Sequence, residues 1–205
     1  MSKYIDLTQT FDSDMPVYPG NWKPELKQVA TIEKDGWSDY EIKTGVHIGT
    51  HMDGPLHMIA NGKKISEINP ENFFGRGILI DARGKERIDA SFLENTNTQA
   101  GYIVLVLTGF GQKFHDADYY EKYPELTEDF AQKLVELKVK MVGTDTPTPD
   151  RPPFAVHKIL LSKEILILEN LSNLEQLIDK QFEVIALPLK FNVDSALARV
   201  VAKII

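Results

Sequence analysis

The chain has 205 residues, of which 42% are hydrophobic, so one domain over residues 1–205 with a substantial core is expected. It carries 23 Lys and Arg against 30 Asp and Glu, a net charge of −7 without long blocks of like charge, which argues against nucleic acid and anionic membranes as partners. Without cysteine, a bound metal would need nitrogen and oxygen ligands, which suit zinc, manganese, iron or cobalt.

The N-terminus, MSKYIDLTQTF, lacks a cationic segment followed by an apolar one. No apolar run approaches the roughly 18 residues that a membrane-spanning helix needs. These features predict a cytoplasmic protein.

The first 60 residues mix polar and apolar positions and are repeatedly interrupted by proline and glycine. This pattern predicts twisted or edge strands and functional loops. The interrupting residues include Pro16, Pro19, Gly20, Pro24, Gly45, Gly49, Gly54 and Pro55.

The remainder of the chain alternates short apolar runs with helical patterns, which predicts a mixed α/β domain with a central sheet. One helix is expected over Leu126–Leu137, where Thr127 is a candidate N-cap, and a second over Phe154–Ser162. Buried strands are expected at Gly77–Asp81, Tyr102–Thr108, Val139–Val142, Ile165–Leu168 and Glu183–Pro188.

The segment from His47 to His57, HIGTHMDGPLH, holds three of the five histidines and one carboxylate. In a straight strand His47 and His51 would lie about 13 Å apart, too far for one ion. A turn at Gly49 would bring them to within about 6 Å, and Asp53 could then bind the same ion or bridge to a second. Each histidine alone fits a polar residue in a turn, but the cluster together predicts a metal site.

Two other polar residues are left outside this predicted site. His115 lies in an acidic and aromatic stretch without matching spacing, so we expect it on the surface or in a loop. Asp145, in Thr144-Asp145-Thr146-Pro147, fits a plain turn as well as a residue that orients a ligand, and it is not counted among the ligands.

The stretch HIGTHMDGPLH resembles the His-x-Gly-Thr-His-x-Asp-x-Pro-x-His signature of the cyclase family of metal-dependent hydrolases, which includes bacterial kynurenine formamidases and isatin hydrolases. The resemblance covers almost the whole chain. It continues through residues 80–83, 108–109, 143–147, 157–171 and 187–189.

The resemblance implies a swivelling β/β/α fold, a homodimer or homotetramer, and two divalent ions, Zn²⁺ or alternatively Mn²⁺. It makes His57 the catalytic acid and base. The implied metal ligands are His47, His51, Asp53, His157 and Glu169, with Asp53 and Glu169 bridging. Taken alone, His157 fits a capping or surface histidine, and Glu169 fits a solvated carboxylate at the end of a strand.

The predicted activity is hydrolysis of an amide C–N bond, foremost that of N-formylkynurenine in tryptophan catabolism. Tyr18 is the candidate substrate-binding residue, although the formamidase pattern tends to have Trp there and packing in a proline turn is an equal alternative. The segment Phe191 to Arg199 departs from the family's Asp-Gly-Ser-Pro-like stretch and is a further pocket candidate. Alternatives are hydrolysis of another amide, lactam or lactone, a metal-binding protein without catalysis, and a metal-sequestering or sensing protein.

Overall fold

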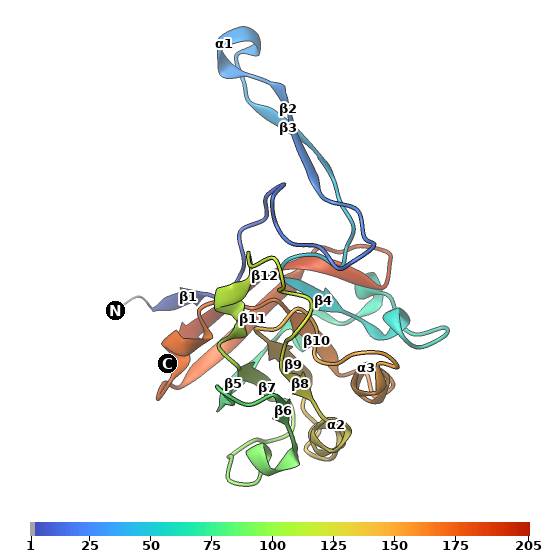
Figure 1. The fold of residues 1–205 in the computed structure, drawn as a ribbon, viewed down its shortest axis with the longest axis vertical. Coiled ribbons are helices and arrows are strands. Elements are labelled where there is room, and N and C mark those ends of the chain that lie inside the picture. Colours follow the sequence, from blue (N-terminus) through green and yellow to red (C-terminus); the bar gives the residue numbers. More distant parts are fainter. Residues whose placement is uncertain (1–2) are drawn as a thin grey trace.

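A computed structural model describes residues 3–205 of the chain (Figure 1). The strands are β1 (Tyr4–Asp6), β2 (Glu25–Ala30), β3 (Asp39–Lys43), β4 (His51–Asp53), β5 (Phe74–Asp81), β6 (Arg87–Ile88), β7 (Ile103–Leu107), β8 (Glu125–Leu126), β9 (Met141–Thr144), β10 (Leu166–Glu169), β11 (Phe182–Pro188) and β12 (Ser195–Ile204). The α-helices are α1 (Ile32–Asp35), α2 (Glu128–Glu136) and α3 (Ala155–Leu161). Short 3-10 helices cover 55–57, 65–67, 70–73, 90–93, 110–113 and 174–177.

The main sheet has eight strands in the order β1-β12-β11-β5-β7-β9-β10-β4. Strands β5, β7, β9 and β10 run parallel to one another, whereas the pairings that involve β11, β12 and β4 are antiparallel. Because β4 pairs with both β10 and β12, the sheet closes into a barrel-like core. The expected mixed α/β class is therefore confirmed, and the central sheet is closed rather than open.

Side chains alternate between two hydrophobic layers along the buried strands, as the two-residue period of a strand requires. In β7, Ile103, Leu105 and Leu107 face one cluster that also receives Ala198 and Val200 of β12. Every residue of β7 is buried, which explains why this strand reads as a continuous apolar run in the sequence.

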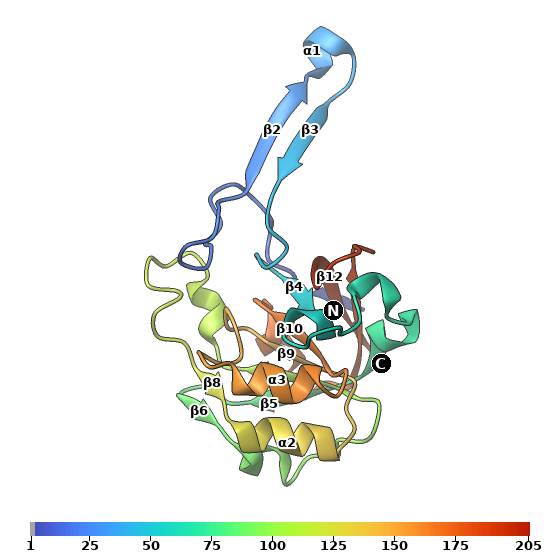
Figure 2. The ribbon, with the colours of Figure 1, turned by 90° about the vertical axis from the view of Figure 1, so that its right-hand side faces the viewer.

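The second hydrophobic layer lies between the sheet and the helices α2 and α3, which lie side by side (Figures 1 and 2). Phe130 and Leu134 of α2 and Leu160 of α3 are fully buried in this layer. Thr127 precedes α2 as expected, but its hydroxyl donates to the Ile88 carbonyl at 3.0 Å and makes no capping bond. The prediction of Thr127 as the N-cap residue is confirmed, although its side chain bonds to strand β6 and not to the first turn of the helix.

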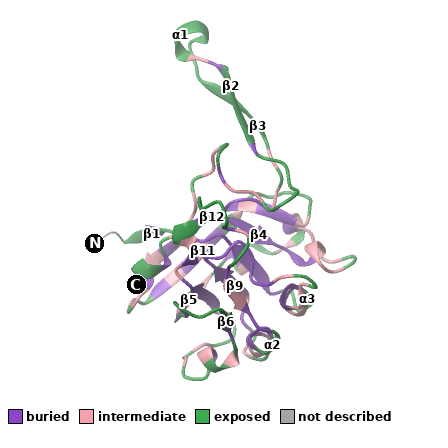
Figure 3. Cartoon of the chain, viewed as in Figure 1, coloured by how far each residue is buried: buried purple, intermediate pink, exposed green. Residues whose placement is uncertain are grey.

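Strands β2 and β3 form an arm that projects from the body and carries α1 at its tip (Figure 2). Every residue of β3 is exposed, and the exposed surface continues along most of β2 (Figure 3). The expectation of edge strands near the N-terminus is thus met by a separate two-stranded hairpin that is largely exposed.

The five predicted strands correspond to β5, β7, β9, β10 and β11, and the two predicted helices to α2 and α3. The ten-residue strand β12 was not predicted. Its signal is a two-residue alternation in which Ala196, Ala198, Val200 and Ala202 are buried. None of the helices among residues 3–205 has the length and apolar character needed to cross a membrane.

Candidate metal centre

Strand β4 positions the central residues of the cluster. It lies between β10 and β12, and its register places His51 opposite Glu169 of β10. Since alternate residues of a strand face the same side, His51 and Asp53 point together to one side while Met52 enters the core. All three residues of β4 are buried. The pairing of β4 with β10 therefore explains how residues 116 to 118 positions apart meet.

A sharp bend before β4 brings His47 to His51. Gly49 has a φ of +55°, a left-handed conformation, and the ring centroids of His47 and His51 lie 5.3 Å apart. The Nδ1 atom of His51 is 2.8 Å from the Gly49 carbonyl, which fixes Nδ1–H as the donor and leaves Nε2 toward the cluster. The turn at Gly49 that the spacing predicts is confirmed.

We expect Gly49→Ala to lower the free energy of unfolding by roughly 1–3 kcal/mol. Alanine would be strained at φ +55°, and its Cβ would lie 2.6 Å from Cε of the buried Met15. Urea denaturation of both proteins measures the difference. Gly45→Ala is the matched control because nothing lies within 4 Å of its added Cβ, and equal losses in the two variants would contradict this account.

Helix α3 brings His157 to the cluster from the opposite side. Its Nδ1 atom is 2.5 Å from Oδ1 of Asp150, whose Oδ2 accepts the Val156 backbone N–H at 2.7 Å. A carboxylate at Nδ1 fixes the tautomer and directs Nε2 of His157 at Asp53 and Glu169. Asp150 is therefore a site residue that sequence reasoning missed.

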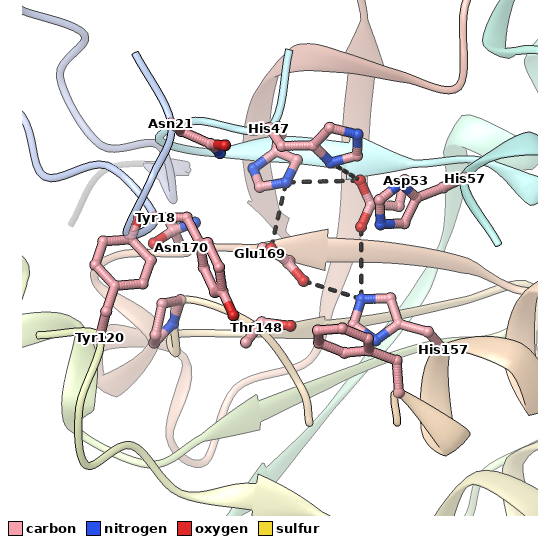
Figure 4. Close-up of a pocket in the computed structure, with 13 residues that line it drawn as sticks. Tyr18, Asn21, His47, Asp53, His57, Tyr120, Thr148, His157, Glu169 and Asn170 are labelled. Atoms are coloured by element: carbon pink, nitrogen blue, oxygen red, sulfur yellow. Dashed lines mark ion pairs between the residues drawn. The ribbon is translucent and has the colours of Figure 1, made fainter. Parts of the chain in front are cut away.

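The two central carboxylates each divide their oxygens between two groups of histidines (Figure 4). Asp53 Oδ1 is 3.0 Å from His47 Nδ1 and 3.5 Å from His51 Nε2, while Oδ2 is 3.7 Å from His157 Nε2. Glu169 Oε2 is 3.2 Å from His51 Nε2, and Oε1 is 3.3 Å from His157 Nε2. This division is the arrangement that two adjacent ions bridged by carboxylates would need.

The residues present fit a divalent metal. His51 Nε2 and Asp53 Oδ1 are buried and lack a hydrogen-bond partner within the described part of the chain. Such buried orphan atoms are rare and call for an ion or water. Two groups have ligand atoms within 4.8 Å of one another, namely His51, Asp53 and Glu169, and His47, Asp53 and His57. Imidazole nitrogen and carboxylate oxygen together suit zinc, manganese or iron.

His57 lies beside His47, with ring centroids 4.1 Å apart, and follows β4 in a short 3-10 helix. Its Nδ1 is 3.2 Å from Oδ2 of Asp194, and the same oxygen is 2.8 Å from His47 Nε2. The ring lines the cavity at the site. It is thus placed to meet a bound substrate, and it is also close enough to His47 and Asp53 to act as a ligand with them.

The charges of the cluster shift its pKa values strongly. Burial is the largest influence on His47 and lowers its pKa, but the adjacent carboxylates of Asp194 and Asp53 outweigh burial and raise it to about 10. Burial also opposes protonation of His51 and His157, yet the neighbouring carboxylates raise both pKa values. The reverse holds for Asp53 and for Glu169: burial favours their neutral forms, but the histidines lower both pKa values.

The metal-free protein should therefore lose stability as pH rises from about 6 to 10. Protonated His47 is stabilised in the fold, and this contribution is complete below its ordinary pKa of 6.5 and disappears as pH passes its folded pKa of about 10. Melting temperatures of metal-stripped protein across this range measure the loss, expected to be a few kcal/mol. His47→Ala should flatten the dependence, and a flat wild-type profile would contradict the assignment.

A cavity of about 270 Å³ opens beside the cluster and is lined by it together with aromatic side chains. Tyr18 lies in this wall and packs edge to face against Tyr120 with ring centroids 5.6 Å apart. Phe154 also lines the cavity, and its ring packs edge to face against the His157 ring with centroids 5.7 Å apart. The expected position of Tyr18 beside the site agrees with this geometry, whereas Tyr120 and Phe154 were missed.

The segment Phe191 to Arg199 reaches the site only in part. Asp194 contacts the histidines, but Arg199 forms a two-pronged ion pair with Asp6 at 2.6 and 3.1 Å. None of these residues lines the cavity, so the expectation that the segment forms the pocket wall was wrong. Within β12 the segment buries Ala196 and Ala198 and exposes Arg199, while Phe191 to Val193 precede the strand and are exposed.

The remaining sequence candidates lie apart from the cluster. His115 is exposed and contacts the Phe114 ring, in agreement with its predicted surface position. Asp145 is buried and accepts hydrogen bonds from the backbone N–H groups of Thr108 and Gly109 at 2.9 and 2.8 Å. It fixes a loop and belongs to neither ligand group.

A closed mixed sheet with buried histidines and carboxylates around a cavity defines this chain as an α/β protein with a candidate metal centre. The family model described as "Putative cyclase" matches residues 5–151. The chain therefore belongs to the Cyclase family, which confirms the family expected from the sequence.

Three similar proteins extend this comparison. Kynurenine formamidase of Bacillus mycoides (strain KBAB4) is 29% identical over 192 residues, which cover 92% of this chain and 90% of that protein. An uncharacterized protein of Methanocaldococcus jannaschii is 38% identical over 205 residues, 97% of each chain. The structure of isatin hydrolase A from Labrenzia aggregata bound to benzyl benzoate has a TM-score of 0.86 and 26% identity, covering 97% of this chain and 92% of that one. Two of these relatives are thus named as hydrolases of amides.

Proposed function

We propose that this protein is a metal-dependent hydrolase of an amide C–N bond, with an arylformamide such as N-formylkynurenine as the foremost substrate. The observation that carries the proposal is the division of the Asp53 and Glu169 oxygens between two groups of histidines. His47, His51, Asp53, His157 and Glu169 would hold two divalent ions, most simply Zn²⁺ and alternatively Mn²⁺. Relatives named kynurenine formamidase and isatin hydrolase support amide hydrolysis.

Divalent ions bound there would lower the pKa of water toward about 7 and polarise a carbonyl oxygen. His57 lies at the cavity with one ring nitrogen held by Asp194, so its other nitrogen can accept a proton from water and return it to the leaving nitrogen. Burial lowers the pKa of His57, which favours its neutral, proton-accepting form near neutral pH.

The aromatic wall supports an aryl substrate. Tyr18, Tyr120 and Phe154 surround the cavity beside the ligands, and planar rings pack favourably against such faces. The amide group of a bound aryl compound would then lie near the carboxylate-bridged centre. A lactam such as isatin presents the same planar aryl group and is the second candidate, which the isatin hydrolase relative supports.

The test of substrate is hydrolysis of N-formylkynurenine, isatin and a formamide without an aromatic ring by the metal-loaded protein. The proposal expects turnover of an aryl amide, with kcat/KM for the ring-free compound lower by tenfold or more. Tyr18→Ala should reduce this preference. Turnover of isatin alone would identify lactams as the substrate class. Equal turnover of the ring-free compound would contradict a pocket that selects aromatic substrates.

We further propose that the protein is a homodimer or a homotetramer joined through its arm. A two-stranded hairpin alone is marginally stable in water, and apolar side chains gathered on an exposed surface are typical of interfaces. The exposed fractions along the arm are 50% for Val29, 67% for Ile32, 62% for Trp37, 56% for Tyr40 and 53% for Ile42. A second copy of the chain would bury this surface.

The double variant Trp37→Ser and Ile42→Ser should shift the protein toward monomer, because it removes two apolar groups from the proposed contact. Sedimentation equilibrium measures the association constant, which should fall at least tenfold. Glu41→Ser is the control on the same exposed strand. A wild type that is monomeric at high concentration, or a variant that associates equally well, would contradict the role of the arm.

The predicted cytoplasmic location stays a prediction, which cell fractionation with an antibody against the protein tests.

A further inference from the structure

Asp194 lies directly before β12 and contacts two histidines with different proposed roles. Its Oδ2 atom is 2.8 Å from Nε2 of His47, a candidate metal ligand, and 3.2 Å from Nδ1 of His57, the candidate acid and base. The side chains are partly shielded, with exposed fractions of 32% for Asp194, 27% for His47 and 23% for His57. One carboxylate oxygen therefore joins the metal centre to the proton-transfer group.

The backbone holds Asp194 firmly in this place. Its carbonyl accepts the Gly54 N–H at 2.9 Å, and the carbonyl of Val193 accepts the Ile65 N–H at 3.0 Å. On its other side the Ser195 hydroxyl donates to the Met52 carbonyl at 2.9 Å, and Ser195 pairs with Asp53 across the sheet. The carboxylate is thus anchored to the same strand that carries the ligands.

An ionised carboxylate can only accept hydrogen bonds, so both contacting ring nitrogens must carry a proton. In His47 the other ring nitrogen, Nδ1, is then the atom available to a metal. It lies 3.0 Å from Asp53 Oδ1. For His57 the same constraint leaves Nε2, which has no hydrogen bond or ion pair to residues 3–205, available to a substrate or water in the cavity. Each remaining nitrogen is the one that its proposed role requires.

We propose that Asp194 is a positioning residue that sets the tautomer and orientation of His47 and His57 together, so that metal affinity and proton transfer depend on one carboxylate. The inference rests on the proposed hydrolase function for its catalytic half. Its metal-binding half does not depend on a substrate. A hydrogen-bonded partner of a ligating histidine commonly contributes 10- to 100-fold to metal affinity, which sets the expected size of the effect.

The first experiment measures Zn²⁺ affinity by chelator competition for wild type, Asp194→Ala and Asp194→Asn. The expected result is a 10- to 100-fold loss in the alanine variant. Asparagine should recover part of this loss, since its carbonyl oxygen can accept the same two hydrogen bonds without the charge. Asn192→Ala is the control, because Asn192 is exposed on the same loop and its side-chain oxygen accepts a hydrogen bond from Ser66, away from the histidines. Circular dichroism verifies that each variant folds.

The second experiment measures kcat and KM at saturating metal for Asp194→Ala, His57→Ala and the double variant. Asp194→Ala should lower kcat at least tenfold with KM changed less than threefold. In the His57→Ala background the same substitution should lower kcat less than threefold, because Asp194 acts through His57. If the double variant loses kcat by the product of the two single-variant losses, Asp194 acts independently of His57 and the catalytic half of the proposal is overturned.

Unchanged Zn²⁺ affinity in Asp194→Ala would overturn the metal-binding half. Asparagine as defective as alanine would overturn positioning through hydrogen bonds, since charge alone would then explain the effect. If wild type binds Zn²⁺ but hydrolyses none of the amides, the proposed function fails while the affinity measurements still test Asp194.

Discussion

Replacing His51 by alanine should remove bound metal and lower kcat/KM by at least about 1,000-fold, because a metal ion supplies several kcal/mol of transition-state stabilisation. His51 is 2% exposed, its Nε2 atom lacks a hydrogen-bond partner among residues 3–205, and both central carboxylates lie within 3.5 Å of that atom. Elemental analysis of the purified variant measures the metal, and hydrolysis of N-formylkynurenine measures the activity.

The matched control for this substitution is His115→Ala. His115 is exposed and lies away from the cluster, so that variant should keep wild-type metal content and activity. Equal metal content in wild type and His51→Ala would remove His51 from the ligand set.

Replacing His57 by alanine should spare metal binding and lower kcat by about 100- to 10,000-fold, the range expected for loss of a general acid and base. Its ring lines the cavity, and Asp194 holds the nitrogen that faces away from the proposed reaction. Steady-state kinetics and elemental analysis on the same preparation measure both quantities.

The metal content of His57→Ala separates two roles, since His57 also lies within ligand distance of His47 and Asp53. Retained metal with low kcat supports proton transfer. Loss of metal together with activity would indicate that His57 is a metal ligand and that another group transfers the proton.

The parts of the fold that the sequence predicts are those with strong apolar patterns. Strand β7 is buried on both faces and therefore appears as an uninterrupted apolar run. Strand β12 escaped prediction because alanine fills three of its buried positions, Ala196, Ala198 and Ala202, and alanine has low strand propensity. Strand β4 has only three residues, two of which belong to the metal cluster.

The local part of the site could be predicted because His47, His51, Asp53 and His57 lie within eleven residues and carry a family signature. Its distant parts, His157 and Glu169, were expected only through the resemblance.

The two positioning residues, Asp150 and Asp194, could not be predicted from the sequence, for a physical reason. Asp150 contacts His157, and Asp194 contacts His47 and His57, from which it is 147 and 137 residues distant in the chain. Neither has a spacing or composition that distinguishes it from a surface aspartate. The aromatic wall formed by Tyr120 and Phe154 likewise exists only once two separate loops meet.

The most direct test of the central claim is titration of metal-stripped protein with Zn²⁺, and separately with Mn²⁺, while hydrolysis of N-formylkynurenine is followed by absorbance. The account predicts no turnover without metal and a rise in activity that saturates at two equivalents per chain. Full activity in the stripped protein, or metal binding without hydrolysis of N-formylkynurenine, isatin or any other amide, would contradict it.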